Sequence, residues 1–326
     1  MEVPCVRVPR REGERVRQQL ADLDAVDRRF RIDATDEWVY IPICSESGID
    51  VAWEIVERDV RKRKQLTLPS DLLETEARYE RLGDIALIDE DNSEDAKALA
   101  DALLTADLPI KTVLNRRSAI SGERRVRDWE IIAGDETETV HREFGAEFLV
   151  DVTVAYFSPR LATERHRVTN QVHPGEHTFD MFAGVGPYII QFAKRGAIGV
   201  GVDINPHAIT YLEENAERNG VSESVTAIHG DVRDVANDYE GWADRIVMNL
   251  PHRANEFLDA AKTIAGDACE LHFYDIQPRE DPFGAGESAI RSVMEPQYTV
   301  TVERRHVVRS YSPDAVNCCL DVRLEK

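Results

Sequence analysis

The stretch DMFAGVGPYII, from Asp180 to Ile190, follows a short apolar run and leads into a helix-like segment. A loop with Gly184 and Gly186 between a strand and a helix is typical of the first βα turn of an open parallel sheet, where glycines let the backbone approach a ligand. A dinucleotide-binding turn would need a third glycine or alanine at position 189, which is Ile189 here. Asp180 opposes a diphosphate but suits a ligand with an ammonium group. The loop therefore indicates another kind of ligand, although the two glycines alone also fit an ordinary tight turn.

The sequence on both sides of this loop sets the fold class. From residue 179 onward, short apolar runs alternate with amphipathic helical segments, which predicts a doubly wound parallel sheet. The runs QYTVTVERRHVVRSY (297–311) and AVNCCLDVRLE (315–325), joined by Ser-Pro-Asp, break this rhythm and predict an antiparallel hairpin at one sheet edge. We expect an α/β protein with a Rossmann-like, doubly wound sheet and a C-terminal antiparallel hairpin, preceded by two smaller α+β domains.

Two further acids end the next two predicted strands. Asp203 closes IGVGVD, 23 residues after Asp180, where a carboxylate can accept both hydroxyls of a ribose. Asp231 ends VTAIHGD, where it is placed to accept a hydrogen bond from an adenine amine. One amino group, one ribose and one adenine describe S-adenosylmethionine, which we expect as the cofactor.

The fourth predicted strand ends in VMNLPH (247–252). Asn249 followed closely by Pro251 resembles the Asn-Pro-Pro-aromatic loop of methyltransferases that act on nitrogen, where an amide clasps the edge of a planar base. The Asn249 side chain offers both a donor and an acceptor for such an edge. A turn-forming Asn, and a Pro that starts the next helix, explain the same residues without a substrate.

The charge of the chain is unusual. The sequence carries 40 Lys and Arg against 61 Asp and Glu, for a net charge of −21, and only 7 of the 40 cations are Lys. An acidic surface poor in Lys keeps a protein hydrated at high salt, which suggests a halophilic host. Residues 1–70 escape this acidity, with 13 Lys and Arg against 14 Asp and Glu. This first segment therefore suits a nucleic-acid partner better than the rest of the chain does.

A chain of 326 residues favours several domains. We expect a small N-terminal domain over 1–65, a central α/β domain over 70–160 and a catalytic domain over 161–326. The first ends in the basic run RKRKQ (61–65), which is a linker or a solvated charge run. In the central domain we expect helices over 72–82 and over 93–104, the second opened by Ser93 as its cap.

Several classes of protein are excluded by what the sequence lacks. The N-terminal stretch has no long apolar core, and no run of about 18 apolar residues occurs, so we expect neither secretion nor a membrane span. The five cysteines never form paired metal-ligand spacings. We expect a cytoplasmic protein with reduced thiols and no metal.

Four motifs in order carry a family resemblance: YFSPRLATERHRV (156–168), DMFAGVGP (180–187), DINPHAITYLEEN (203–215) and MNLPHRANEFLDAA (248–261). With them the chain resembles archaeal tRNA (guanine-37-N1)-methyltransferases over residues 75–326, and less distinctly over 1–70. The resemblance implies methyl transfer from S-adenosylmethionine to N1 of guanosine 37 in tRNA. It also implies that the first domain contacts the tRNA elbow and the other two grip the anticodon stem-loop. We expect the enzyme to act as a monomer.

The resemblance also implies residue roles. Glu164 matches the general base that takes the proton from N1, and a cation aimed at O6 would stabilise the negative charge that gathers there. Arg125 is the candidate for that cation, with Arg124 and Arg127 left open. The expected catalytic residues are Glu164, Arg125, Asn249, Pro251 and, packed beside the target base, Tyr156. The expected cofactor-binding residues are Arg160 at the methionine carboxylate, Asp180, Phe182, Gly184, Gly186, Asp203, Ile204, Asp231, Val232 and Asn249.

Other interpretations stay open. Glu164 between arginines fits a surface ion pair, and the basic cluster around Arg125 fits phosphate contacts alone. A related aminocarboxypropyl transferase of wyosine synthesis uses the same cofactor, and some relatives methylate a wyosine intermediate at position 37. The combination of Asn249, Pro251 and Glu164 favours methyl transfer. A protein of another class would be a non-catalytic RNA-binding protein that retains a degenerate cofactor fold.

Overall fold

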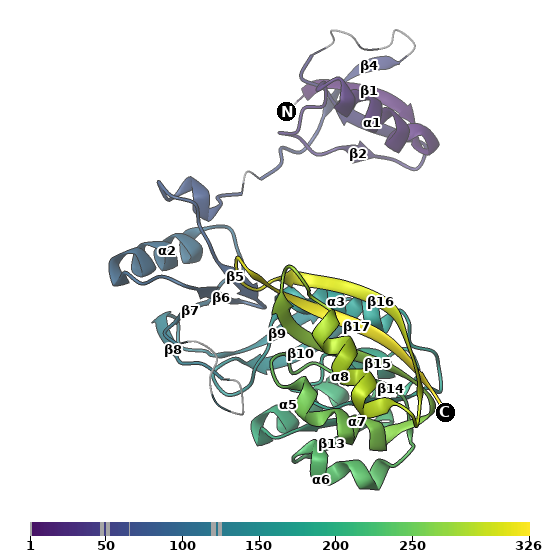
Figure 1. Ribbon diagram of the computed structural model, residues 1–326. Coiled ribbons are helices and arrows are strands. Elements are labelled where there is room, and N and C mark those ends of the chain that lie inside the picture. Colours follow the sequence, from purple (N-terminus) through teal and green to yellow (C-terminus); the bar gives the residue numbers. More distant parts are fainter. Residues whose placement is uncertain (1, 46–48, 50–52, 65, 119–121, 123–125) are drawn as a thin grey trace. The chain divides into compact units, whose positions relative to one another are not determined.

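The computed structural model describes all residues except 1, 46–48, 50–52, 65, 119–121 and 123–125 (Figure 1). The chain divides into two compact units, Met1–Leu68 and Pro69–Lys326, and each is described by itself.

The first unit is a four-stranded antiparallel sheet covered by one helix. The strand order is β2-β3-β1-β4. The elements are β1 (Glu2–Pro9), α1 (Gly13–Asp22), β2 (Asp33–Ala34), β3 (Trp38–Pro42) and β4 (Glu54–Asp59). The alternating residues Val6 and Val8 of β1 face the same core as Val16 and Leu20 of α1. This alternation on the strand and helical spacing on the helix explain how so short a segment buries a core.

The second unit begins with a smaller sheet of order β5-β6-β7-β8. Its elements are β5 (Glu80–Leu82), β6 (Ile85–Ile88), α2 (Ser93–Thr105), β7 (Thr112–Arg116) and β8 (Trp129–Ala133). The helix predicted over 72–82 is wrong, because Gly83 at φ +55° turns the chain tightly and the end of that segment pairs with β6 as a strand. The cap of α2 is also one residue earlier than predicted: the Asn92 side chain accepts from the Glu94 N–H at 2.8 Å.

A two-stranded hairpin, β9 (Glu138–Glu143) and β10 (Ala146–Asp151), follows the smaller sheet. It packs on helix α5 (Pro206–Arg218), where the Leu149 N–H donates to Asn215 Oδ1 at 2.6 Å and Asn215 Nδ2 donates back to the Leu149 carbonyl at 3.0 Å. The hairpin therefore lies against the elements that follow it in sequence, within the same unit.

The centre of the second unit is a seven-stranded mixed sheet of order β13-β12-β11-β14-β15-β17-β16. Its strands are β11 (His177–Asp180), β12 (Ile198–Asp203), β13 (Val225–His229), β14 (Ala243–Met248), β15 (Ala265–Pro278), β16 (Thr299–Ser310) and β17 (Ala315–Glu325). β11 to β15 run parallel, and β17 joins β15 in antiparallel fashion with β16 at the edge. The predicted fold class, including the C-terminal hairpin, is confirmed.

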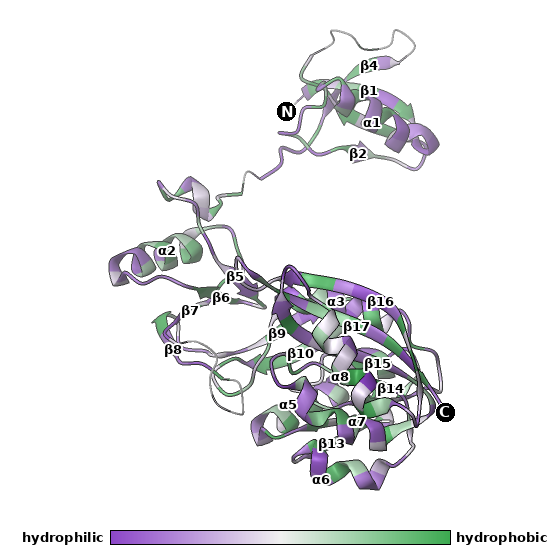
Figure 2. Ribbon diagram, viewed as in Figure 1, coloured by the Kyte–Doolittle hydropathy of each residue, from purple (hydrophilic) through white to green (hydrophobic). Residues whose placement is uncertain are grey.

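Helices cover both faces of this sheet (Figure 1). They are α3 (Ala162–Thr169), α4 (Ile189–Ala193), α5, α6 (Val232–Val235), α7 (Leu258–Ile264) and α8 (Gly284–Met294). Short 3₁₀ turns are Arg10–Glu12, Pro69–Asp71, Pro159–Leu161, Ser222–Ser224, Ala236–Tyr239 and Ala254–Phe257. Along β14, Ile246 and Met248 face the core shared with α7 and α8, whereas Val247 faces the core shared with α4 and α5. Both faces of the sheet are thus apolar. Figure 2 colours the ribbon by hydropathy, with hydrophobic residues in green.

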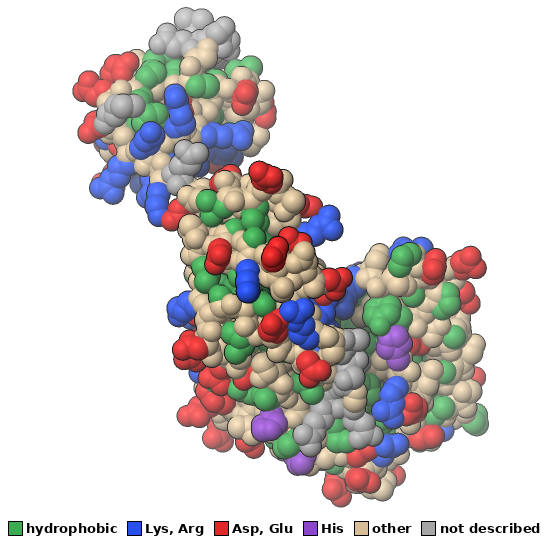
Figure 3. All heavy atoms as spheres, turned by 90° about the vertical axis from the view of Figure 1, so that its left-hand side faces the viewer, with side chains coloured by type: hydrophobic (Ala, Val, Ile, Leu, Met, Phe, Trp, Pro, Cys, Tyr) green, Lys and Arg blue, Asp and Glu red, His purple; other side chains and the backbone are tan. Residues whose placement is uncertain are grey.

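Charge is distributed unevenly on the surface. Figure 3 shows several Lys and Arg side chains gathered on one side of the first unit, and Asp and Glu side chains scattered over the visible face of the second. Across the part of the chain that is described, no helix is both long enough and apolar enough to cross a membrane. All five cysteines are free thiols.

Candidate active site

A cavity of about 380 Å³ opens at the carboxyl ends of β11, β12 and β14. Its size falls in the range of roughly 300–1,000 Å³ that is usual for small-molecule sites. In an open parallel sheet, ligands bind at this edge where the strand order reverses, here between β11 and β14. The predicted site residues that line it are Tyr156, Asp180, Phe182, Gly184, Asp203, Ile204, Asp231, Val232, Asn249 and Pro251.

The glycine loop after β11 forms the floor of the cavity. Gly184 and Gly186 have φ of +53° and +89°, which side chains rarely adopt. A Cβ on Gly186 would also come within 2.8 Å of the Ile190 side chain. Gly186 therefore lies beneath the loop and shapes it, without itself lining the cavity.

Asp180 lies at the end of β11 and is fully buried. Burial raises the pKa of its carboxyl to about 7, the Phe182 N–H that it accepts at 3.2 Å works against this rise, and the neighbouring Asp203 adds to it. No cation among the described residues pairs with this carboxylate. A positively charged ligand group beside it would favour its ionised form.

Asp203 ties the end of β12 to the glycine loop. Its Oδ2 accepts the Gly184 N–H at 2.8 Å and its Oδ1 accepts the Asn205 N–H at 2.8 Å. Burial raises its pKa, while these two backbone hydrogen bonds and His229 oppose the rise. Each carboxylate oxygen retains a further lone pair, so the pair of oxygens can still accept from two hydroxyls.

Asp231 is at the cavity but differs from the other two acids. It caps α6, and its carboxylate accepts from the Arg233 N–H at 2.9 Å and from the Arg233 guanidinium Nε at 3.0 Å. The hydrogen bond and charge of Arg233 hold its pKa below the ordinary range. Asp231 is therefore already matched by a cation, and its contact with an adenine stays a prediction.

The loop after β14 forms the opposite wall. Asn249 and Pro251 line the cavity, and within the described residues no hydrogen bond engages the Asn249 amide. His252 has a φ of +79°, a strained value for a side chain other than glycine, and its ring meets Tyr311 edge-on at 5.4 Å. The loop is thus held against the C-terminal hairpin with an amide left available for a ligand.

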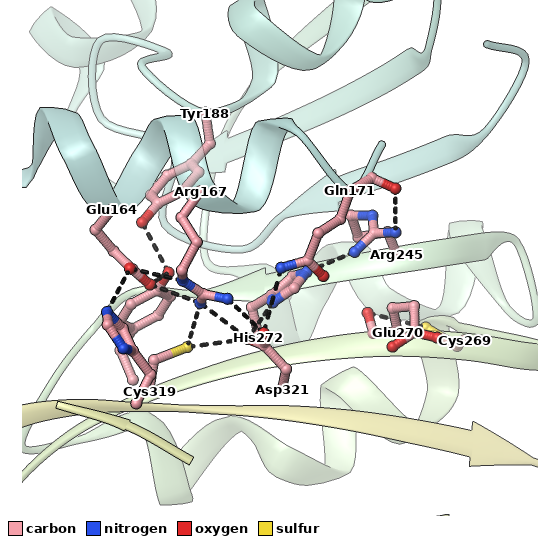
Figure 4. A network of polar contacts seen from close by, with 12 residues as sticks. Glu164, Arg167, Gln171, Tyr188, Arg245, Cys269, Glu270, His272, Cys319 and Asp321 are labelled. Carbon is pink, nitrogen blue, oxygen red and sulfur yellow. Dashed lines mark hydrogen bonds and ion pairs between the residues drawn. The ribbon is translucent and has the colours of Figure 1, made fainter. Parts of the chain in front are cut away.

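Glu164 lies behind the cavity wall. Its Oε1 accepts from the Tyr274 hydroxyl at 2.7 Å, its Oε2 accepts from Arg167 Nε at 2.8 Å, and His306 Nε2 is 3.2 Å from Oε2 (Figure 4). Burial raises its pKa, but Arg167, Tyr274 and His306 together outweigh burial and lower it. Tyr188, which lines the cavity, donates to the Tyr274 hydroxyl at 3.0 Å. Two hydroxyls therefore connect Glu164 to the cavity.

The network around Glu164 continues under the sheet. Arg167 Nη2 donates to Asp321 Oδ1 at 3.0 Å, and His272 Nδ1 lies 2.8 Å from the same oxygen. In the described part of the chain, His272, Cys319 and Asp321 are the one trio close enough to hold a metal. Arg167 also donates to the Cys319 thiol at 3.5 Å, so a guanidinium already supplies the positive charge there.

Of the expected arginines that the structure describes, Arg160 and Arg127 do not line this cavity. Arg160 is exposed and pairs with Glu80, its Nε 2.8 Å from Oε2, beside a smaller neighbouring cavity. Arg125, with Arg124, lies outside the described residues. Arg127 lines the same smaller cavity as Arg160, with its guanidinium 5.5 Å from the centre of the Trp129 ring.

Sequence reasoning missed Arg309 and Asn317, which are cross-strand partners on β16 and β17 and both line the large cavity. Asn317 is buried and its Oδ1 has no hydrogen-bond partner; the buried Nε of Arg309 has none either. A signal was present, because Asn317 interrupts the apolar run AVNCCL of a predicted strand. Buried polar atoms without partners at a cavity are candidates for ligand contacts.

Comparison with known families matches three parts of the chain. The TRM5/TYW2 methyltransferase domain matches residues 139–295, the tRNA methyltransferase 5 N-terminal domain matches residues 5–50, and the TYW2 N-terminal domain matches residues 63–137.

Individual relatives agree with these matches. The tRNA (guanine(37)-N(1))-methyltransferase Trm5b of Pyrococcus abyssi is 38% identical over 98% of this chain and 98% of its own, and its crystal structure superposes with a TM-score of 0.74 at 99% and 100% coverage. The structure of aTrm5 with tRNALeu is 27% identical, covers 98% of this chain and 99% of its own, and has a TM-score of 0.72. A tRNA(Phe) (4-demethylwyosine(37)-C(7)) aminocarboxypropyltransferase of Pyrococcus horikoshii is 32% identical over 82% of this chain and 96% of its own.

Proposed function

Because the chain belongs to the TRM5/TYW2 methyltransferase family, we propose that it transfers the methyl group of S-adenosylmethionine to N1 of guanosine 37 in tRNA. The observation that carries this proposal is the meeting of Asp180, Asp203, Asp231 and Asn249 at one cavity, at the edge of the sheet where such ligands bind. These groups offer acceptors for an amino group, a ribose and an adenine, and an amide for a base edge.

The family also contains aminocarboxypropyl transferases, and one observation favours methyl transfer. The Trm5b relative aligns with 98% of this chain, whereas the aminocarboxypropyltransferase aligns with 82%. Residues 5–50 moreover match the tRNA methyltransferase 5 N-terminal domain. The first unit of this chain is therefore a part that it shares with the methyltransferases.

The reaction requires this chain to bind the cofactor, to hold the base and to remove a proton from it. The sulfonium of the cofactor supplies the methyl group and its leaving group, so the protein must position N1 in line with it and remove the N1 proton. Asn249 and Pro251 hold the base edge after the guanine leaves the stack. In our proposal Asp203 binds the ribose, Asp180 binds the ammonium group, and Ile204 and Val232 contact the adenine.

Glu164 is our proposal for the group that receives the N1 proton. Its lowered pKa keeps it ionised at neutral pH, so it can accept a proton, and the Tyr274 and Tyr188 hydroxyls connect it to the cavity. Arg125 remains the proposed cation for O6, Tyr156 the residue beside the base, and Arg160 the partner of the methionine carboxylate. Arg160 would have to exchange Glu80 for that carboxylate.

The setting of the enzyme is also proposed. The charge of −21 with 7 Lys supports a halophilic host. We propose a cytoplasmic monomer with three domains, 1–65, 70–160 and 161–326, of which the first meets the tRNA elbow and the others meet the anticodon stem-loop.

The decisive experiment is nucleoside analysis of the product RNA by mass spectrometry. The purified protein is incubated in concentrated KCl with S-adenosylmethionine and a tRNA transcript that carries either G37 or A37. We expect 1-methylguanosine from the first transcript and no methylation of the second. Methylation of both, methylation of neither by folded protein, or an aminocarboxypropyl product would refute the assignment.

A further inference from the structure

A second cavity, of about 90 Å³, adjoins the methyltransferase cavity. The two share a wall made of Tyr156, Phe157, Ser158 and Arg309. Much of the remaining wall comes from Arg116 of β7, Trp129 of β8 and Arg127 of the segment that precedes β8. We call this second space the arginine cavity, because its charged lining residues are Arg116, Arg127, Arg160, Arg309 and Glu80.

The arginines of this cavity are only partly matched by acids. Arg160 pairs with Glu80 at 2.8 Å, and Arg116 pairs with Asp89 at 2.5 Å. Arg127 stacks on Trp129, and neither it nor Arg309 forms an ion pair with any residue in the described ranges. Two guanidinium groups without an ion-pair partner in the described part of the chain therefore line the same cavity.

Hydrogen bonding gives a second, independent indication. The Nε groups of Arg116 and Arg309 are buried and have no hydrogen-bond partner. Burying such donors without a partner costs stability, and the guanidinium groups that carry them line the arginine cavity. Arginine is suited to this because its planar fork binds the oxygens of a phosphate two at a time.

We propose that the arginine cavity binds a backbone phosphate of the RNA, next to the nucleotide whose base enters the methyltransferase cavity. The proposal rests on the proposed function, since it assumes an RNA substrate. Arg309 lies on the wall between the two cavities, so a phosphate held there would fix the backbone at the point where the base turns away from the strand. Phosphate contacts of this kind set register and orientation without reading sequence.

A cofactor carboxylate is the competing anion, and the place of Arg116 and Arg127 in the chain argues against it as their partner. Asp203 and Asp231, which we assign to the cofactor, follow strands of the large sheet. Arg116 and Arg127 instead come from the smaller sheet and the segment that precedes β8, a part of the chain that precedes the matched methyltransferase domain, residues 139–295. Arg160, which we assign to the cofactor carboxylate, comes from a different part of the chain than these two arginines, and an RNA strand is long enough to contact both parts at once.

The test compares Arg309→Gln with Arg304→Gln. Arg304 is on the same strand, is exposed and lines neither cavity. Its replacement therefore removes the same positive charge at a position outside the proposed site. Affinity for a tRNA transcript is measured at several KCl concentrations, and affinity for S-adenosylmethionine is measured by calorimetry. We expect Arg309→Gln to weaken RNA binding about tenfold, to reduce the salt slope by about 1 and to leave cofactor affinity within about twofold. Arg304→Gln should change none of these by more than about twofold.

A chemical variant identifies the anion directly. Anticodon stem-loop RNAs are made with a single uncharged methylphosphonate at each linkage near residue 37. At the linkage that Arg309 contacts, the methylphosphonate should weaken binding to the natural protein about tenfold and should weaken binding to Arg309→Gln no further. Arg309→Lys, which keeps the charge and loses the fork, should recover part of the affinity.

Three outcomes would overturn the proposal. If Arg309→Gln and Arg304→Gln bind RNA with equal affinity, Arg309 does not contact a phosphate. A loss of cofactor affinity assigns the cavity to the methionine carboxylate instead. Equal sensitivity of the natural protein and Arg309→Gln to every methylphosphonate also contradicts it. These readouts are binding measurements, so a protein that binds the RNA and methylates another position would refute the proposed function and leave the cavity proposal standing.

Discussion

Charged groups in two regions of the second unit differ in how they are matched. Beneath the large sheet, Arg167 bonds both Glu164 and Asp321, and Arg245 pairs with Glu176 at 2.9 Å, so each guanidinium of this buried network meets an acid (Figure 4). At the two cavities, some charges of each sign lack a partner of opposite sign. Asp180 has no cation beside it there, and Arg309 has no acid, within the described residues.

The difference separates two uses of charge. A buried ion is costly to remove from water, so a matched network is tolerated because its members satisfy one another, and it fixes how α3 docks on β15 and β17. Unmatched charges at a cavity are costly until a ligand of opposite charge arrives, which is the arrangement expected at a binding site. Matched groups should therefore affect stability, and unmatched groups should affect binding.

The largest effect is expected from breaking the matched network. Arg167→Met leaves Glu164 and Asp321 buried without their shared cation, which should lower the free energy of unfolding by about 3–5 kcal/mol. Urea unfolding followed by circular dichroism measures this. The exposed Arg304→Gln serves as the control and should change stability by less than about 0.5 kcal/mol. Equal stabilities of the two variants would show that the network is not structural.

The pH dependence of stability is a second test of whether the matched network stabilises the fold. Burial raises the pKa of Asp321, but His272 and Arg167 outweigh it and hold the pKa far below the ordinary value; burial lowers the pKa of His272 despite Asp321. Both groups have a lower pKa folded than unfolded. Their contribution to stability is therefore fully present above the unfolded pKa values, about 6.5 for His and 4 for Asp, and is lost as the pH falls below these values and through the lower folded ones. Unfolding free energies between pH 8 and 3 should fall accordingly, and less steeply in Arg167→Met.

Glu164 belongs to the matched network and is also our proposed base. A variant of Glu164 therefore tests whether one residue serves both stability and catalysis. Glu164→Gln keeps a hydrogen-bonding side chain but cannot receive the N1 proton, so turnover should fall by roughly 10²- to 10⁴-fold. Cofactor affinity should stay within about twofold, because Glu164 does not line the cavity. Single-turnover methylation across pH 6–9 measures the effect. Normal turnover over that whole range would remove Glu164 from this role and leave it a structural ion pair.

The sequence could predict the cavity acids because a general rule applies to them. Carboxyl ends of parallel strands share one edge, so Asp180, Asp203 and Asp231 had to meet once the strands were recognised. The wrong helix over 72–82 shows the opposite case, since a tight turn at Gly83 and burial of Leu82 in the small sheet override a helical pattern.

The matched network and the arginine cavity could not be predicted in this way. Glu164 meets Tyr274, 110 residues away, and Arg167 meets Asp321, 154 residues away. Arg309 and Asn317 meet through the register of a hairpin that also contains irregularities, so one position of slip would have turned them to the other face. Which charges are matched depends on such distant pairings, and local patterns do not contain them.

Asp203 and Asp231 allow matched and unmatched acids to be compared by their effect on cofactor binding. Asp203 has no cation within hydrogen-bonding distance in the described chain, whereas Asp231 is already held by Arg233. Asp203→Asn should therefore weaken binding of S-adenosylmethionine by roughly 10- to 100-fold, as expected for hydrogen bonds to a charged group. Asp231→Asn should cost less than about fivefold, because its charge is already matched. Titration calorimetry measures both, and a larger loss for Asp231→Asn would contradict the distinction.

The last effect concerns the unmatched carboxyl of Asp180. With a pKa of about 7, it is mostly protonated at pH 6 and mostly ionised at pH 8 in the free protein. A cationic ligand binds the ionised form, so affinity for S-adenosylmethionine should rise by up to about tenfold from pH 6 to pH 8 and level off above. Asp180→Asn should bind more weakly and without this pH dependence. The product of methyl transfer has an uncharged sulfur in place of the sulfonium, but it retains the ammonium group. Comparing the pH dependence of its binding with that of the cofactor therefore separates the two cations. Equal pH profiles for cofactor and product would thus assign Asp180 to the ammonium, and a flat profile for both would show that the carboxyl meets no cation at all.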